Sequence, residues 1–444
     1  MVLPPQLRTR LLSRLRPTPA EESALRSAVE TLFARARGAA RSLGLQVEPL
    51  HVGSSARSTW RRGERDIDIF LLFPPGTPRE DLEQRGLALA RKVCPKGRVK
   101  YAEHPYLRGQ WEGFGVDLVP AYKLESAAER KTAVDRTPFH HDHVKRRVAG
   151  REEEVLLLKQ HLAGAGVYGA EAKTRGFSGY LCELLILHFG SFEKCVEAMA
   201  KWRPPVHLDS EGEGTFAGED PLVFIDPVDP GRNVAAALSR ESLARAVEHA
   251  RALLRKPSLA LFFPEPPAPL KPGELGRRLR ARGTEMTALV LPAPDRLVDD
   301  TVYPQLRRAE ESLTALLKKN EFHIFRSGVH RIGGRGFVLF ELPAAPLPRL
   351  RLHEGPPLFF EGDSRRFLKA HGGRPRFMRG DRWVVELERK HRTVPTFLEA
   401  EAKRAGLGRD LAKGRFEVWD SRKIERSKEL REFLGGYFAG REPV

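Results

Sequence analysis

The segment GERDIDIFLLF, residues 63–73, constrains this chain more than any other part of its sequence. Strand alternation puts Asp66 and Asp68 on one face of an expected strand and Ile67 on the other. Two carboxylates this close repel each other, and burial strengthens the repulsion, so the pair calls for a cation. Mg²⁺ suits the pair because it prefers oxygen ligands and keeps water and substrate phosphates in its other positions. An acidic strand edge facing solvent is the alternative, and other features must decide.

Two such features point to nucleotidyl transfer. Upstream, HVGSSARSTW places Gly53 and Ser54 between an expected strand and a short helix, where backbone N–H groups and a hydroxyl can hold a triphosphate. Downstream, GVDLVPAY places Asp117 on another strand. A third carboxylate on a neighbouring strand would complete a two-metal clamp, in which one ion activates a 3′ hydroxyl and the other steadies the leaving pyrophosphate.

The charge of the chain favours a polyanionic partner. Lys and Arg total 76 against 58 for Asp and Glu, which gives a formal net charge of +18. Such a surplus favours nucleic acid because neutralised phosphates release their counterions. A merely solvated basic surface is the alternative reading of the same charge.

The cysteines and the apolar segments indicate the compartment. Cys94, Cys182 and Cys195 include no closely spaced pair of the kind that marks zinc ribbons or redox motifs. We therefore expect a reducing, cytoplasmic environment. The N-terminal segment has no apolar run that suits a secretory signal, and no stretch approaches the roughly 20 apolar residues of a membrane span. No membrane partner is expected.

Apolar periodicity predicts a mixed α/β region followed by a helical one. A helix is expected over residues 19–43, with Thr18 as its N-cap and Glu21 as the carboxylate of a capping box. Strands are expected at residues 45–53, 66–73, 98–102 and 116–119. Residues 151–200 carry three apolar stripes at helical spacing, which predict a helical bundle.

A proline-rich segment predicts a domain boundary. The stretch FFPEPPAPLKPGE, residues 262–274, holds five prolines and so excludes regular structure. Beyond it, three strands are expected at residues 286–294, 323–329 and 337–343, around a helix near residues 304–319. The segment FMRGDRWVVELE predicts a hairpin.

A longer series of motifs resembles one enzyme family. The strings are GSSARSTWRRGERDIDIFLLFP, YAEHPY, VDRTPFHH, YGAEAKTRGFSGYLCELL and DPVDPGRNVAA, between about residues 50 and 240. They are similar, in the family's order, to the archaeal-type (class I) CCA-adding enzymes, which are tRNA nucleotidyltransferases of the polymerase-β-like nucleotidyltransferase superfamily. Weaker similarity, beginning at VDDTVYPQLRRA, continues to the C-terminus.

The resemblance implies a multidomain α/β and α+β fold. A polymerase-β-like nucleotidyltransferase head with a mixed sheet is expected over residues 1–150. A helical domain that positions nucleotide and primer follows over residues 151–262. An α+β RNA-binding body and tail is expected over residues 275–444.

The resemblance also implies roles for particular residues. Asp66, Asp68 and Asp117 are expected to be the catalytic carboxylates and to bind two Mg²⁺ ions; the first position is Glu in some members of the family. The residues expected at the nucleotide, ATP or CTP, are Gly53, Ser54, Arg57, His140, Lys159, Tyr168 and Arg232. Arg232 is expected to face the incoming base, where guanidinium donors can tell C and A from U and G.

Each nucleotide-binding assignment has a structural alternative. Lys159 can be the solvated edge of an amphipathic helix, and Tyr168 a packed aromatic at a loop. Arg232 can cap a helix that begins near Asn233. His140 belongs to HHDH, but no cysteine or second histidine pair stands at the usual spacing of a structural zinc site.

The expected activity is template-independent addition of C, C and A to the 3′ end of tRNA from CTP and ATP. Recognition of the acceptor arm should rest on phosphates and helix shape, because side chains read RNA major grooves poorly. The basic runs at residues 390–392 and 421–428 are candidate contacts, or else solvated helix faces. The rival functions are a poly(A) or poly(U) polymerase on the same head and a non-catalytic RNA-binding protein. The choice between a monomer and a homodimer stays open.

Overall fold

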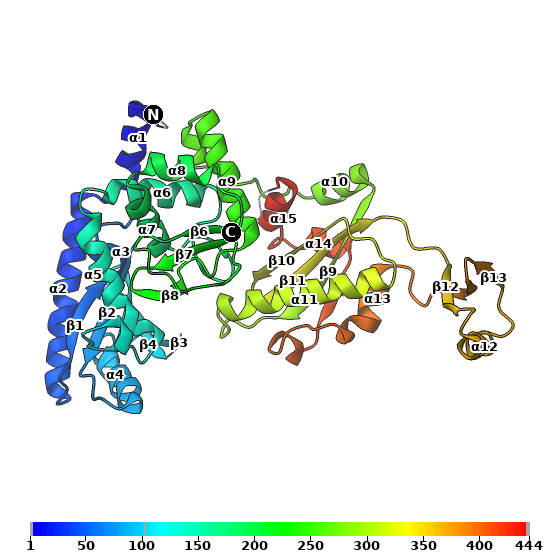
Figure 1. The fold of residues 1–444 in the computed structure, drawn as a ribbon, viewed down its shortest axis with the longest axis horizontal. Coiled ribbons are helices and arrows are strands. Elements are labelled where there is room, and N and C mark those ends of the chain that lie inside the picture. Colours follow the sequence, from blue (N-terminus) through cyan, green and yellow to red (C-terminus); the bar gives the residue numbers. More distant parts are fainter. Residues whose placement is uncertain (1–2, 102–103, 441–444) are drawn as a thin grey trace. The chain divides into compact units, whose positions relative to one another are not determined.

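The computed structural model describes residues 3–101 and 104–440, and the chain forms two compact units, residues 1–265 and 266–444 (Figure 1). No helix within the described residues combines the length and the apolar character that crossing a membrane requires. Each unit is built around its own sheets and cores.

The first unit contains the mixed sheet that the sequence predicts. In spatial order its strands are β1 (Glu48–Val52), β2 (Asp66–Phe73), β5 (Phe114–Tyr122), β4 (Pro105–Trp111) and β3 (Arg98–Tyr101). β2 and β5 are parallel, and the other neighbouring pairs are antiparallel. Strand β4 was not predicted, and Ala102, the last residue of the expected strand at 98–102, lies outside the described residues.

Two helices cover one face of this sheet. Helix α2 (Pro19–Ser42) begins with the predicted capping box between Thr18 and Glu21, and helix α4 (Arg79–Val93) lies beside it. Alternate strand residues, among them Ile67 and Leu118, are buried with these helices in one core. Alternation therefore turns Asp66, Asp68 and Asp117 toward the opposite face.

The rest of the first unit is helical with one small sheet. Its helices are α1 (Pro5–Leu15), α3 (Gly53–Ala56), α5 (Thr137–Val148), α6 (Glu152–Gly164), α7 (Gly179–Phe189), α8 (Phe192–Met199) and α9 (Arg240–Arg255), with short 3₁₀ turns at Ala127–Glu129, Ala133–Arg136 and Leu259–Leu261. The sheet, which was not predicted, consists of β6 (Val206–Leu208), β7 (Leu222–Asp226) and β8 (Asp229–Asn233). The alternative of a helix beginning near Asn233 is wrong, because Asn233 ends β8 and the next helix begins at Arg240.

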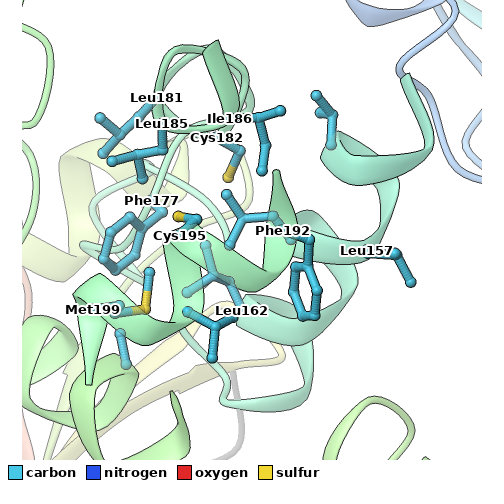
Figure 2. Packing of buried hydrophobic residues seen from close by; sticks show 14 of the residues in the cluster. Leu157, Leu162, Phe177, Leu181, Cys182, Leu185, Ile186, Phe192, Cys195 and Met199 are labelled. Atoms are coloured by element: carbon cyan, nitrogen blue, oxygen red, sulfur yellow. The ribbon is translucent and has the colours of Figure 1, made fainter. Parts of the chain in front are cut away.

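The helices of this region share one apolar core, which Figure 2 shows from close by. Leu157, Leu185 and Phe192 come from three different helices and are fully buried. Cys182 and Cys195 pack in the same core as reduced thiols. The apolar stripes predicted for residues 151–200 therefore face one another, as helices that bury one face require.

The second unit begins at Pro266, within the proline-rich segment, and no regular element lies between Leu261 and Glu274, as predicted. Its larger sheet has the order β10 (Arg326–Ile332), β11 (Arg335–Pro343), β9 (Thr284–Pro292) and β15 (Glu417–Trp419). Its helices are α10 (Glu274–Arg282), α11 (Asp299–Lys319), α13 (Val394–Glu401), α14 (Ser421–Arg426) and α15 (Arg431–Phe438), with 3₁₀ turns at Ala402–Arg404 and Leu411–Lys413. Apolar cores lie on both faces of this sheet.

A smaller sheet in the second unit contains the predicted hairpin. Its order is β12 (Leu350–Pro357), β14 (Arg382–Glu388) and β13 (Arg376–Arg379), with helix α12 (Glu361–Ala370) against β12. The β13–β14 turn contains Gly380, whose φ of 59° suits glycine.

The core of the first unit predicts a clear contrast between two leucines. Leu185 is fully buried on α7, whereas Leu254 on α9 is 39% exposed. Leu185→Ala should lower the free energy of unfolding by about 2–5 kcal/mol, because it leaves a cavity. Leu254→Ala should change it by less than about 1 kcal/mol. Denaturant unfolding of both variants measures the difference, and equal effects would contradict the described core.

Candidate active site

The three predicted carboxylates lie on neighbouring strands, at the face of the mixed sheet opposite α2 and α4. In the parallel register of β2 and β5, Asp68 stands directly opposite Asp117, and Asp66 stands opposite Gly115. Neighbouring strands are about 4.8 Å apart, so side chains at opposed positions on one face are close. The structure thus brings together residues that are about 50 positions apart in the sequence.

An arginine that the sequence analysis missed balances this charge. Arg108 on β4 is the register partner of Asp117, donates from Nη1 to Asp117 Oδ2 at 2.9 Å, and donates from Nη2 to Asp66 Oδ1. Gly115 makes room for it, since a Cβ there would lie 2.5 Å from Arg108 Nη2. One guanidinium therefore joins two of the three carboxylates.

Among the described residues no arginine or lysine pairs with Asp68, and the pKa of its carboxyl differs accordingly. Burial, followed by the charges of Asp117 and Asp66, raises the pKa of the Asp68 carboxyl to about 6. Burial also raises the pKa of Asp117, although Arg108 acts in the opposite direction. The cluster holds more negative charge than one arginine neutralises, which is the condition that favours a bound cation.

The donor set fits a divalent metal ion. Asp117 Oδ1 is buried and has no hydrogen-bond partner in the described part of the chain, so this carboxylate keeps an oxygen for a further ligand. Carboxylate oxygens are ligands that Mg²⁺ prefers. Among the described residues, no three acidic, histidine or cysteine side chains already stand in a metal-binding arrangement, and Arg108 Nη1 and Nη2 contact two of the three candidates.

The turn after β1 lies against Asp68. Gly53 follows Val52, the register partner of Asp68, and has a φ of 80°. A Cβ at Gly53 would lie 2.2 Å from Asp68 Oδ2, so no larger residue fits there without moving the carboxylate. Ser54 lies in the first turn of α3, immediately beside it. The predicted turn and the acidic pair thus form one site.

Arg57 is held by a buried carboxylate. Its Nε and Nη2 donate to the two oxygens of Glu183 at 3.1 and 2.7 Å, and the Thr59 hydroxyl also donates to Glu183. Glu183 on α7 is fully buried, and Arg57 is 9% exposed. The charge of Arg57 still acts on Asp68, in the direction that lowers the pKa of that carboxyl.

The side-chain ends of Lys159 and Tyr168 both lie near Gly179, the first residue of α7. A methyl group at Gly179 would lie 3.3 Å from the Tyr168 hydroxyl and 3.6 Å from Lys159 Nζ. Lys159 Nζ donates to the carbonyl of Thr59 at 2.7 Å. Lys159 is only 1% exposed, so the alternative of a solvated helix edge is wrong.

His140 and Arg232 meet at a second buried carboxylate, Asp226. His140 Nε2 lies 2.9 Å from Asp226 Oδ2, and Arg232 Nη1 donates to the same oxygen at 2.7 Å. The Tyr180 ring stacks on His140 with centroids 4.3 Å apart, and the Tyr180 hydroxyl donates to Asp226 Oδ1 at 3.3 Å.

Helix α7 organises these contacts. Glu183 lies four residues after Gly179 and three after Tyr180, so each of these two residues neighbours Glu183 on the helix surface. Through them the structure gathers Arg57, His140, Lys159, Tyr168 and Arg232, which come from five separate places in the sequence.

Comparisons with known proteins identify the family. A model of the nucleotidyltransferase domain matches residues 35–140, a model of the second domain of tRNA nucleotidyltransferase matches 153–263, and a model of the C-terminal domain of the CCA-adding enzyme matches 282–420. The CCA-adding enzyme of Methanosarcina acetivorans is 40% identical over 97% of this chain and 98% of that protein. Those of Halorubrum lacusprofundi and Haloarcula marismortui are 43% and 41% identical, over 88% of this chain and over 89% and 88% of those proteins. The chain belongs to the CCA-adding enzyme family.

The family and the multidomain fold expected from the motifs are therefore confirmed. Among solved structures, the Cid1 poly(U) polymerase aligns at 13% identity and a TM-score of 0.45, over 56% of this chain and 92% of that one, which is too distant to bear on function. The contacts of individual residues with metal or nucleotide, and the three domain boundaries, stay predictions.

Sequence reasoning missed three residues of this CCA-adding enzyme site. Glu183 lies in the apolar helix sequence GYLCELLIL, and a lone charge in a buried helix signals a partner. Asp226 ends the apolar strand LVFID and carries the same signal. Arg108 gave no comparable signal, because a proline begins its strand and a glycine follows it.

The Gly53 turn yields a test of the acidic site. Gly53→Ala should lower the rate of nucleotide addition at least about tenfold, because the added methyl group displaces the Asp68 carboxylate. Gly63→Ala is the matched control: Gly63 has a φ of 84°, but a Cβ there meets nothing within 4 Å. Both variants carry the strain of a left-handed alanine, about 1–2 kcal/mol. Addition rates and thermal unfolding separate the two effects, and equal losses of rate would contradict the close approach.

Proposed function

We propose that this chain adds C, C and A stepwise to the 3′ end of tRNA, from CTP and ATP and without a nucleic-acid template, in the cytoplasm. The observation that carries the proposal is the register of Asp68 against Asp117, beside a turn that only glycine fits. It occurs in a chain whose relatives over nearly its full length are CCA-adding enzymes.

In this proposal, Asp66, Asp68 and Asp117 bind two Mg²⁺ ions. When bound, the ions would activate the 3′ hydroxyl and neutralise the leaving pyrophosphate. The carboxylates supply hard oxygen ligands on rigid, paired strands, and Arg108 orients two of them. Water exclusion is aided by the apolar residues on the same sheet face, among them Phe70 and Val119.

The triphosphate lies in this proposal at Gly53 and Ser54, whose backbone N–H groups and hydroxyl can bind phosphate oxygens. Arg57 and Lys159 supply positive charge that would attract the triphosphate. Two nitrogens of Arg57 donate to Glu183, and Lys159 donates to the carbonyl of Thr59. These hydrogen bonds hold the two basic side chains in fixed positions. His140, Tyr168 and Arg232 contact the nucleoside.

The acceptor arm of tRNA binds, in this proposal, along the distal part of the chain, residues 275–444. The candidate contacts there are two basic runs, at residues 390–392 and 421–428. In the second run, residues 421–426 form helix α14, and residues 427 and 428 follow the helix. Phosphate contacts of this kind position an RNA helix without reading its sequence.

The deciding experiment offers the protein a tRNA that lacks CCA, with each nucleotide alone and with CTP and ATP together. CTP alone should add two residues, the pair of nucleotides should give one complete CCA end, and mature tRNA should not be extended. Length and composition of the product are read from labelled RNA. A long homopolymer, or UTP incorporated as readily as CTP, would identify a poly(A) or poly(U) polymerase instead, and no addition at all would favour a non-catalytic RNA-binding protein.

A further inference from the structure

Asp226 is a buried anion with an unusually complete set of partners. It ends β7, is fully buried, and its carboxylate contacts side chains of α5 and α7. Its Oδ1 accepts from the Tyr180 hydroxyl at 3.3 Å and from the backbone N–H of Val228 at 3.0 Å. Its Oδ2 contacts His140 Nε2 at 2.9 Å and accepts from Arg232 Nη1 at 2.7 Å.

These four contacts use the whole accepting capacity of the carboxylate, which has about four lone-pair sites. Burial alone would raise the pKa of Asp226, but the bonds from His140, Val228 and Arg232 lower it to about 2. A saturated anion has no lone pair left for a ligand. What Asp226 can do is to fix the orientation of the groups that bind it.

Arg232 is the group whose orientation matters most. One of its five N–H hydrogens bonds to Asp226, and its side chain is 34% exposed, so the side chain is accessible to a ligand. Because the guanidinium of Arg232 is planar and rigid, a hydrogen bond that fixes one of its nitrogens also sets the direction of its other N–H groups.

The direction of these N–H groups decides which bases the arginine can bind. C and A each present an amino group beside a ring nitrogen that accepts, whereas U and G present a carbonyl oxygen beside a ring N–H. A donor held opposite the ring nitrogen suits C and A and meets an N–H in U and G. A guanidinium that could swing would instead donate to the carbonyl oxygen of U or G.

We propose that Asp226 is a specificity-determining positioning residue, which holds Arg232 so that the site accepts C and A and rejects U and G. This inference rests on the proposed function, in which Arg232 faces the incoming base. His140 contacts the same oxygen of Asp226 as Arg232 does, and Tyr180 donates to the other oxygen. Tyr180 thus joins the base-selecting group from α7, one turn before Glu183.

The chain offers a matched control three residues away. Asp229, at the start of β8, is 8% exposed and pairs with Arg136 at 2.8 Å and Arg130 at 3.3 Å. Within the described residues, Asp229 makes no hydrogen bond or ion pair with His140 or Arg232. Asp229→Asn therefore removes a comparable buried charge without touching the base-selecting arginine.

The test compares Asp226→Asn with Asp229→Asn and the unmodified enzyme. The kcat/KM values for CTP and UTP are measured on tRNA lacking CCA, with thermal unfolding of each variant. Asp226→Asn should raise the ratio of UTP to CTP use at least about tenfold, since a charge-assisted hydrogen bond that fixes Arg232 is lost. Asp229→Asn should leave that ratio within about twofold of the unmodified enzyme.

A double-mutant cycle then asks whether Asp226 acts through Arg232. In an Arg232→Ala background, Asp226→Asn should change the UTP to CTP ratio no further. Tyr180→Phe, which removes one hydroxyl from the carboxylate, should raise the ratio by a smaller factor, and it decides the question if Asp226→Asn does not fold.

An unchanged UTP to CTP ratio in a folded Asp226→Asn variant, or in Tyr180→Phe where the first variant does not fold, would overturn the inference even if both nucleotides react more slowly. Full additivity with Arg232→Ala would overturn it too. Failure of the proposed function looks different, because the unmodified enzyme would then use UTP as readily as CTP.

Discussion

Repulsion among three aspartates is the constraint around which the catalytic face is arranged. Asp66 and Asp68 share one strand face, and the parallel register sets Asp68 opposite Asp117. Ladder hydrogen bonds fix the backbone at these positions, so the carboxylates can separate only by rotation of their side chains. In the part of the chain that the structure describes, Arg108 pairs with Asp66 and Asp117 but not with Asp68, which stands beside two further negative charges. The sheet register therefore creates the excess of negative charge that favours a cation, and the turn at Gly53 lies directly against the Asp68 carboxylate.

Two buried carboxylates, Glu183 and Asp226, hold the basic side chains that are proposed to bind the nucleotide. Glu183 holds Arg57, and Asp226 holds His140 and Arg232, while Tyr180 and Glu183 are one turn apart on α7. An unpaired buried charge is costly, so each pair holds its basic partner firmly in one orientation. CCA addition proceeds without a template strand, so a protein group that selects the incoming base must keep its donors in place. Rigid placement of Arg57 and Arg232 is thus a property of the apolar core that surrounds the two carboxylates.

The sequence predicted the parts of this arrangement that depend on local pattern. Alternation located β2 and the facing of its aspartates, the capping box located the start of α2, and prolines located the segment between the units. It did not predict β4 or the β6–β7–β8 sheet, whose strands are short or contain glycine and proline and therefore lack a clear period of two. Partners such as Arg108 for Asp66, 42 residues apart, depend on sheet order, which no local pattern encodes. Lys159 was correctly placed on a helix, but its burial depends on packing against Thr59 and Gly179.

The most direct test of the account is Asp68→Asn, measured for both activity and stability. Asn keeps the size of the side chain but removes the charge that the cation requires and that Asp66 and Asp117 repel. The account predicts that CCA addition falls at least about a hundredfold, because a metal ligand worth several kcal/mol is lost. It predicts that tRNA affinity is retained and that the melting temperature without metal stays equal or rises, because repulsion is relieved. Full activity, or a clearly lower melting temperature, would show that Asp68 is a structural residue and that the acidic cluster has been misread.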